Sequence, residues 1–130
     1  MKQELDDMLL EICERDPRYK DDAYEFVLEA LSYTQKRLRR SRHVTGKELL
    51  EGIKDLLIEK FGPLTLTVLQ HWGIKTTEDF GYIVFNMVEK KILSKTEEDN
   101  IESFKDVYDF EAVFNKRYRD RLAKQISRLR

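Results

Sequence analysis

The spacing of apolar residues predicts a chain built almost wholly from helices. From Lys2 to Glu14, apolar side chains recur every three or four residues, the pattern of one helical face. A second helix is expected to start at Asp16 and Pro17, a capping residue followed by one well tolerated in a first turn, and to reach about Leu38. Its apolar positions form two adjacent rows, which predicts that this helix is covered on more than one side.

The next helix has clear signals at both ends. Thr45 and Glu48 have the spacing of a capping box, in which each side chain binds a backbone N–H near the helix start. Gly62 permits a left-handed exit, and Pro63 prevents the helix from continuing. We therefore expect a helix from Thr45 to about residue 61.

The stretch from Phe61 to Leu93 predicts the centre of the fold. It holds the single tryptophan and three of the five glycines. The pattern predicts a helix of about two turns from Leu64 to Trp72, a turn at Gly73, and a longer helix capped by Thr76 or Thr77. The longer helix is apolar nearly all round, which is typical of a helix buried on most sides. Such a helix-turn-helix binds DNA in some proteins and only builds the core in others.

Two interpretations stay open for the segment that follows. In the first, Ile92–Thr96 and Ile101–Phe104 pair as a small β-hairpin, which is the wing of a winged helix. In the second, a helical turn starts near Asp99. Asp109 then caps a last helix, in which an apolar residue recurs every four positions as far as Ile126.

These elements predict a mainly α fold of about six helices with a helix-turn-helix core, with or without the winged-helix hairpin. A length of 130 residues fits one domain, residues 1–130, with a peripheral helix at 1–15 and a peripheral basic helix at 111–130.

One cysteine excludes an internal disulfide, and no apolar run is long enough to cross a bilayer, so we expect a cytoplasmic protein. The many Lys, Glu and Arg residues are typical of proteins from hot environments.

Charge is distributed in blocks, although the formal net charge is only −1. Residues 35–47 carry six basic and no acidic side chains, and residues 111–130 carry seven basic and two acidic ones. Such blocks create local fields that can hold phosphate groups of RNA or DNA without reading bases. The candidate phosphate contacts are Lys36, Arg37, Arg39, Arg40, Arg42, Lys116, Arg117, Arg119, Arg121 and Lys124. The alternative is that these arginines form a solvated face.

Other functions fit the sequence less well. Glu78 and Asp79, at the start of the second helix of the helix-turn-helix, would repel DNA in its major groove. The chain has only two histidines, His43 and His71, and no paired nucleophile and base, so we expect no enzymatic activity, cofactor or metal site. The second hypothesis is a protein interaction or self-association module, such as a homodimer, that uses the terminal amphipathic helices.

Several segments resemble an uncharacterised bacterial family of conserved hypothetical proteins, of the planctomycete and verrucomicrobia type. The resemblance runs from about Asp16 to Phe110, and its most specific part is the run around His71, Trp72 and Gly73. The segments are DPRY, AYEFVLEALSYT, TGKELLEGI, FGPLTLTVLQHWGI, TTEDFGYIVFNMVE and LSKTEED with DVYDF. The family has no assigned activity, so the resemblance implies a cytoplasmic bacterial domain and nothing about mechanism.

Overall fold

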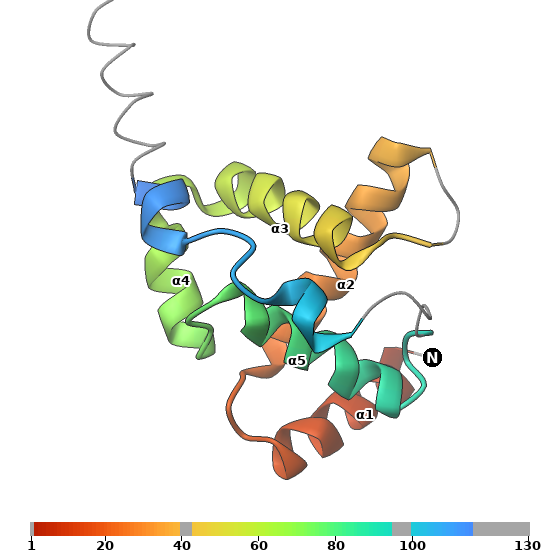
Figure 1. Ribbon diagram of the computed structural model, residues 1–130. Helices are drawn as coiled ribbons and strands as arrows, with labels where there is room; N and C mark the ends of the chain where they lie inside the picture. The colour runs from red at the N-terminus through yellow and green to blue at the C-terminus, as the bar shows by residue number, and fades with distance from the viewer. Residues whose placement is uncertain (1, 40–42, 95–99, 116–130) are drawn as a thin grey trace, which may run out of the picture.

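The computed structural model describes residues 2–39, 43–94 and 100–115, and these form a helical assembly (Figure 1). Within them are five α-helices and three short helical segments, and no strand is present in these ranges. The mainly α fold class is therefore confirmed. The α-helices are α1 (Lys2–Arg15), α2 (Asp21–Leu38), α3 (Gly46–Phe61), α4 (Thr65–Trp72) and α5 (Thr77–Glu89). The short segments are the 3-10 helices η1 (Gly62–Leu64) and η2 (Ile101–Phe104) and the π-helical turn η3 (Glu111–Asn115).

Helix α5 lies at the centre, between α1 and α3, as the apolar pattern predicts (Figure 1). Phe80, Ile83 and Met87 of α5 have no exposed surface. A Cβ atom added to Gly81 would lie 2.8 Å from Phe104, so η2 packs directly on the α5 backbone. Helix α5 is thus a core element.

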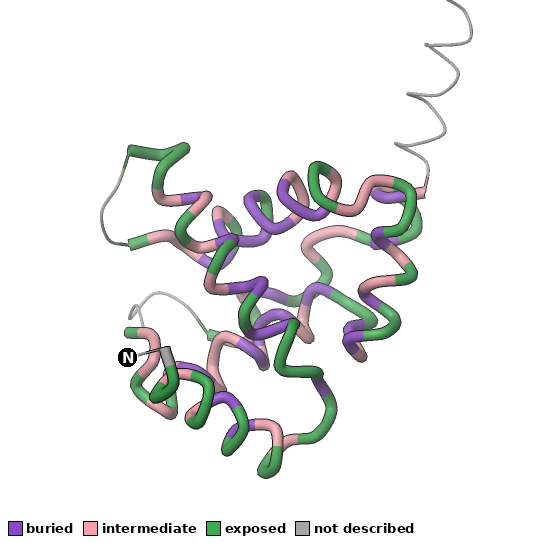
Figure 2. The backbone as a smooth tube through the Cα atoms, turned by 180° about the vertical axis from the view of Figure 1, so that it is seen from behind, coloured by how far each residue is buried: buried purple, intermediate pink, exposed green. Residues whose placement is uncertain are grey.

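Helices α2 and α3 approach closely at a glycine. A Cβ atom on Gly52 would lie 1.8 Å from the Thr34 hydroxyl oxygen, which donates to the Ala30 carbonyl at 2.7 Å. Purple in Figure 2 marks buried residues, which occur in all five α-helices. Helix α1 contributes Leu9 and Ile12 to this core, which leaves Leu10 as its large exposed apolar side chain.

The predicted helix boundaries at α3 are confirmed. The Thr45 hydroxyl accepts from the Glu48 N–H at 3.1 Å, and the Glu48 carboxylate accepts from the Thr45 N–H at 2.9 Å. Gly62 follows α3 with a φ of 48°, and Gly73 follows α4 with a φ of 84°. Capping chemistry fixes these ends because it satisfies backbone groups that the helix leaves unpaired.

The predicted start of α2 at Asp16 and Pro17 is wrong, because α2 begins at Asp21. Asp16 does not cap a helix: its carboxylate accepts from Nε and Nη2 of Arg18 at 2.8 and 2.7 Å. Tyr19 is buried, and its hydroxyl donates to Asp79 at 2.5 Å. The connection from α1 to α2 is therefore an irregular segment held by side chains.

The winged-helix hairpin is also wrong, because residues 101–104 form η2 instead of a strand. The Asn100 side chain accepts from the Glu102 N–H at 2.9 Å, which is helix capping and close to the helical alternative. The Phe104 carbonyl accepts from the Thr77 hydroxyl at 2.6 Å, so a side chain ties η2 to α5. The predicted count of about six helices differs slightly from the five α-helices in the described ranges. The π-helical turn η3 is the described part of the last predicted helix, and residues 116–130 lie outside these ranges.

None of the helices within these ranges combines the length and the apolar character that a bilayer crossing requires.

Candidate functional site

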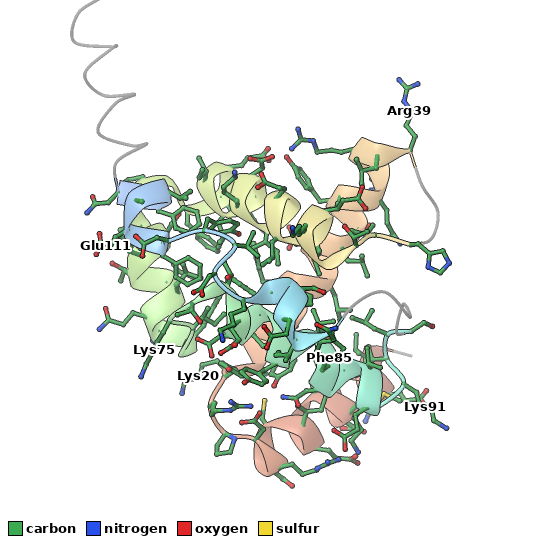
Figure 3. All side chains as sticks on the ribbon, viewed as in Figure 1. Lys20, Arg39, Lys75, Phe85, Lys91 and Glu111 are labelled. Carbon is green, nitrogen blue, oxygen red and sulfur yellow. The ribbon has the colours of Figure 1, made fainter. Side chains whose placement is uncertain are left out.

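The C-terminal end of α2 carries exposed cations, as the sequence predicts. We call Lys36, Arg37 and Arg39 the basic end of α2. Arg39 adopts a left-handed conformation with a φ of 55°, and Figure 3 shows its side chain pointing away from the body of the protein. No carboxylate of the described residues forms an ion pair with Lys36 or Arg39. Both cations face solvent.

Arg37 differs from these two because it is already engaged within the fold. Its Nη1 atom lies 2.5 Å from a carboxylate oxygen of Asp55 on α3 and 3.3 Å from the Tyr33 hydroxyl. Its guanidinium also lies 5.5 Å from the centre of the Tyr33 ring. The hydrogen bond with Asp55 raises the pKa of Arg37, and this ion pair offsets part of its charge. Arg37 is therefore the weakest of the three as a phosphate contact.

The other candidate contacts, namely Arg40, Arg42, Lys116, Arg117, Arg119, Arg121 and Lys124, lie outside the described residues. The two basic blocks are attached at opposite ends of α3 (Figure 1). The first block, residues 35–47, runs into the start of α3 at Gly46, whereas the second block, residues 111–130, begins with η3, which packs against α4 and η1. A helix of this length spans about 24 Å. The two blocks can therefore form one continuous patch only if the second block extends back along α3. That the blocks form one patch remains a prediction.

Polar side chains at the start of α5 make contacts within the fold. Oδ2 of Asp79 accepts from the backbone N–H groups of Lys75 and Thr76 at 2.7 and 3.1 Å, while Oδ1 accepts from Tyr19. Thr77 is fully buried, and its hydroxyl accepts from the Val107 N–H at 3.2 Å. These contacts are structural, so the acidic residue that disfavours DNA binding serves the fold.

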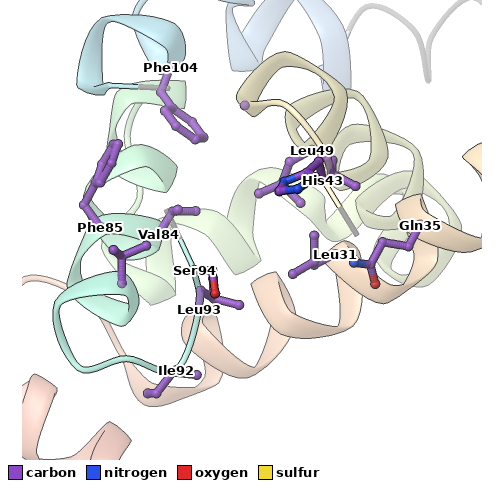
Figure 4. Close-up of a pocket in the computed structure, with 13 residues that line it drawn as sticks. Leu31, Gln35, His43, Leu49, Val84, Phe85, Ile92, Leu93, Ser94 and Phe104 are labelled. Carbon is purple, nitrogen blue, oxygen red and sulfur yellow. The ribbon is translucent and has the colours of Figure 1, made fainter. Parts of the chain in front are cut away.

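An apolar pocket of about 520 Å³ lies between α2, α5, η2 and the start of α3 (Figure 4). Its apolar lining is Leu31, Val44, Leu49, Val84, Phe85, Val88, Ile92, Leu93 and Phe104, and its polar side chains are Gln35, His43 and Ser94. His43 is the one described lining residue with an ionisable side chain, so no acid and base pair occurs among these residues. This pocket cannot be predicted from the sequence, because its wall is assembled from four separate segments.

A second hollow, of about 540 Å³, lies between α2, α4 and the end of α3, and we call it the acidic groove. Asp22, Glu25 and Glu29 of α2 form one edge, and Thr67, Val68 and His71 of α4 line the other. The floor is a cluster of three aromatic rings: Phe26 and Phe61 lie 5.3 and 5.8 Å from Trp72, measured between ring centres. Such a combination suits a partner with both apolar and cationic groups.

A polar cluster around Asp16 joins the α1–α2 connection to α5. Nδ2 of Asn86 donates to Asp16 at 2.9 Å and to the Tyr24 hydroxyl at 3.0 Å. The hydrogen bond from Arg18 holds the pKa of Asp16 well below its usual range, and burial raises the pKa of Tyr24 to about 12. Asp16 therefore stays ionised and Tyr24 neutral, which is the behaviour of a structural cluster.

Among the described residues, no group of three or more histidine, cysteine, aspartate or glutamate side chains is placed to hold a metal ion. His43 and His71 are both exposed and lie on different surfaces, the apolar pocket and the acidic groove.

Comparisons with protein-family models, curated proteins and solved structures found no match to this chain. The resemblance to a bacterial family thus stays a prediction.

Proposed function

We propose that this chain is a non-enzymatic binding protein that contacts the phosphate backbone of RNA or DNA through its arginine-rich segments. The observation that carries the proposal is the basic end of α2, where Lys36 and Arg39 are exposed and have no carboxylate partner in the described part of the chain. The block that contains them, residues 35–47, has six basic and no acidic side chains. A cytoplasmic location belongs to the same proposal.

The electrostatics of this helix end favour anions in spite of the helix dipole. The C-terminus of a helix carries about half a negative charge, spread over its last carbonyl groups. Lys36 and Arg39 each add a full positive charge nearby, and the backbone N–H of Arg39 caps the Gln35 and Lys36 carbonyls. The cations therefore outweigh the dipole, and the local potential is positive.

The alternative hypothesis, protein interaction through the terminal helices, now depends on the C-terminal stretch. Helix α1 buries Leu9 and Ile12 in the core and is tied to α5 by ion pairs of Arg15 with Glu89 and of Lys90 with Glu11. Its apolar face is thus used internally. The basic stretch after Asn115 is the remaining terminal segment for a partner.

Charge reversal with a matched control tests the proposal. The Lys36→Glu/Arg39→Glu variant removes the two unpaired cations, whereas Lys20→Glu/Lys75→Glu changes the net charge equally at exposed positions away from Arg39 (Figure 3). Binding to labelled single-stranded RNA and to duplex DNA would be followed by fluorescence anisotropy at about 50 mM salt. We expect the first variant to bind on the order of tenfold more weakly and the control to change little, because local phosphate contacts dominate such binding.

Two results would refute the proposal. In the first, the wild-type chain fails to bind either nucleic acid at this salt concentration. In the second, both double variants weaken binding to the same extent, which would show that only the net charge matters.

A further inference from the structure

We propose that the acidic groove is the docking site of the chain's own basic C-terminal stretch, residues 116–130. The inference goes beyond the proposed function and uses part of the same basic sequence: docking in the groove would compete with phosphate groups for the cations of residues 116–130. It rests on the chemistry of the groove, on the sequence of the stretch, and on the point where the stretch leaves the described fold.

The groove presents unpaired negative charge above an apolar floor. Asp22 and Glu25 are exposed, and no cation of the described residues pairs with either of them. Glu29 differs, because its carboxylate binds the Lys60 ammonium at 2.7 Å. Beneath them the half-buried side chains of Phe61 and Val68 add apolar surface that neighbouring residues only partly cover.

The sequence of the stretch is complementary to this surface. Residues 116–130 carry seven basic side chains and one acidic side chain, Asp120. Tyr118, Leu122 and Ile126 recur every four residues, which predicts one apolar row along a helix with cations on both sides of it. Such a helix would place its apolar row on the aromatic floor and its cations against the glutamate and aspartate edge.

The point of attachment makes the contact possible within one chain. The described part ends at Asn115 in η3, which packs against α4 and η1. Helix α4 is one wall of the groove, and η1 directly follows the groove residues Lys60 and Phe61. Four extended residues span about 13 Å, which is comparable with the length of α4, an eight-residue helix of about 12 Å. A linker of this size can therefore pass along α4 and leave the rest of the stretch for the groove.

The tether favours this intramolecular contact over binding to a second copy. A short flexible link gives an effective concentration in the millimolar range, far above the micromolar concentration of a typical protein solution. Each exposed ion pair contributes only about 0–1 kcal/mol, and salt screens it. We therefore expect docking to be reversible and to weaken as salt is added.

Disulfide trapping in the full chain tests the contact directly. In a Cys13→Ser background, Thr67→Cys places a thiol on the groove wall and Ala123→Cys places one beside Leu122 in the stretch. The matched control combines Ala123→Cys with Leu10→Cys, on the exposed surface of α1 and away from the groove. On mild oxidation we expect an intrachain disulfide for the Thr67 pair, at least several-fold faster than for the Leu10 pair. Adding Asp22→Lys and Glu25→Lys should remove the difference.

Three outcomes of the trapping experiment would overturn the proposal. These are absence of a disulfide in the Thr67 pair, equal rates for the two pairs, and disulfides only between chains at a rate that rises with protein concentration. The last outcome would identify a second copy as the occupant.

Amide hydrogen exchange provides a second measurement that needs no cysteine. In the chain with its own cysteine, Asp22→Lys/Glu25→Lys should speed exchange across residues 116–130 and leave the core amides unchanged, because both sites are exposed on α2. Unchanged exchange in residues 116–130 would contradict the proposal.

Discussion

At the residue scale, the contact between Gly52 and Thr34 limits how a side chain at position 52 could fit between α2 and α3. The side chain of Thr34 occupies the space where a Cβ atom of residue 52 would lie, and its hydroxyl is bound to the preceding turn of α2. Both residues are buried, so neither can move into solvent. Any larger residue at position 52 must push the two helices apart.

We therefore predict that Gly52→Ala lowers the free energy of unfolding by about 1–3 kcal/mol, the usual cost of overpacking. Thr34→Ala removes the hydroxyl that blocks the new methyl group, so the double variant should recover much of this loss. Chemical denaturation of the two single variants and the double variant gives the coupling energy. Additive effects would mean that the contact between these residues does not limit the approach of the helices.

Asp16 is a second residue whose contacts have a measurable consequence, namely a dependence of stability on pH. Hydrogen bonds from Arg18 and Asn86 favour its ionised form, so the folded-state pKa lies below the unfolded-state value of about 4. A depressed pKa contributes stability that is present above the unfolded-state value and is lost as the pH falls below it. The contribution of Asp16 is thus complete at neutral pH.

Asp16→Asn should lower stability at pH 7 by about 1–2 kcal/mol, since it removes charge-assisted hydrogen bonds. The difference from wild type should narrow steadily as the pH falls from about 5 to about 2. Thermal unfolding midpoints of the variant and of wild type at each pH measure this difference in stability. The control is Glu14→Gln, at an exposed position. A difference that stays constant over this range would show that the charge of Asp16 is not the cause.

At the scale of elements, Thr77 attaches η2 to the start of α5. Its hydroxyl donates to the Phe104 carbonyl and accepts from the Val107 N–H, and both Thr77 and Phe104 are almost fully buried. These contacts hold residues 101–107 against the core without strand pairing among the described residues, and Phe104 also lines the apolar pocket.

Thr77→Val keeps the shape of the side chain but leaves the Phe104 carbonyl and the Val107 N–H without a hydrogen-bond partner. We expect this change to lower the free energy of unfolding by about 1–3 kcal/mol. We also predict that the backbone amide of Val107 exchanges faster in this variant than in the wild-type chain. Thr77→Ser retains the hydroxyl and should preserve most of the protection. If the valine and serine variants behave alike, the hydroxyl does not anchor η2.

The elements that the sequence predicts well are those with local signals. The capping box at Thr45 and the glycine at position 73 act through neighbouring backbone groups, so their effect can be read from a few residues. The start of α2 and the hairpin were mispredicted because long-range contacts decide them: Tyr19 reaches Asp79, and Phe104 reaches Thr77. The apolar pocket and the acidic groove could not be predicted, since each combines side chains from separate helices.

At the scale of the whole molecule, α2 carries both candidate surfaces. Asp22, Glu25 and Glu29 lie in its first half at the acidic groove, and Lys36 and Arg39 lie at its other end. A helix of eighteen residues is about 27 Å long, so the two surfaces are well separated. This order of charges also agrees with the helix dipole, which favours anions at the start and cations at the end. The net charge of −1 conceals this separation.

The dependence of RNA binding on salt is the most direct test of the proposed function. The full chain would be titrated with labelled single-stranded RNA between about 50 and 200 mM KCl. We predict that the logarithm of the association constant falls linearly with the logarithm of salt concentration, with a slope of about −3 or steeper, as expected when several phosphates are neutralised at about −0.7 each. Absence of binding at the lowest salt concentration, or a slope near zero, would contradict the proposal that the arginine-rich segments hold a phosphate backbone.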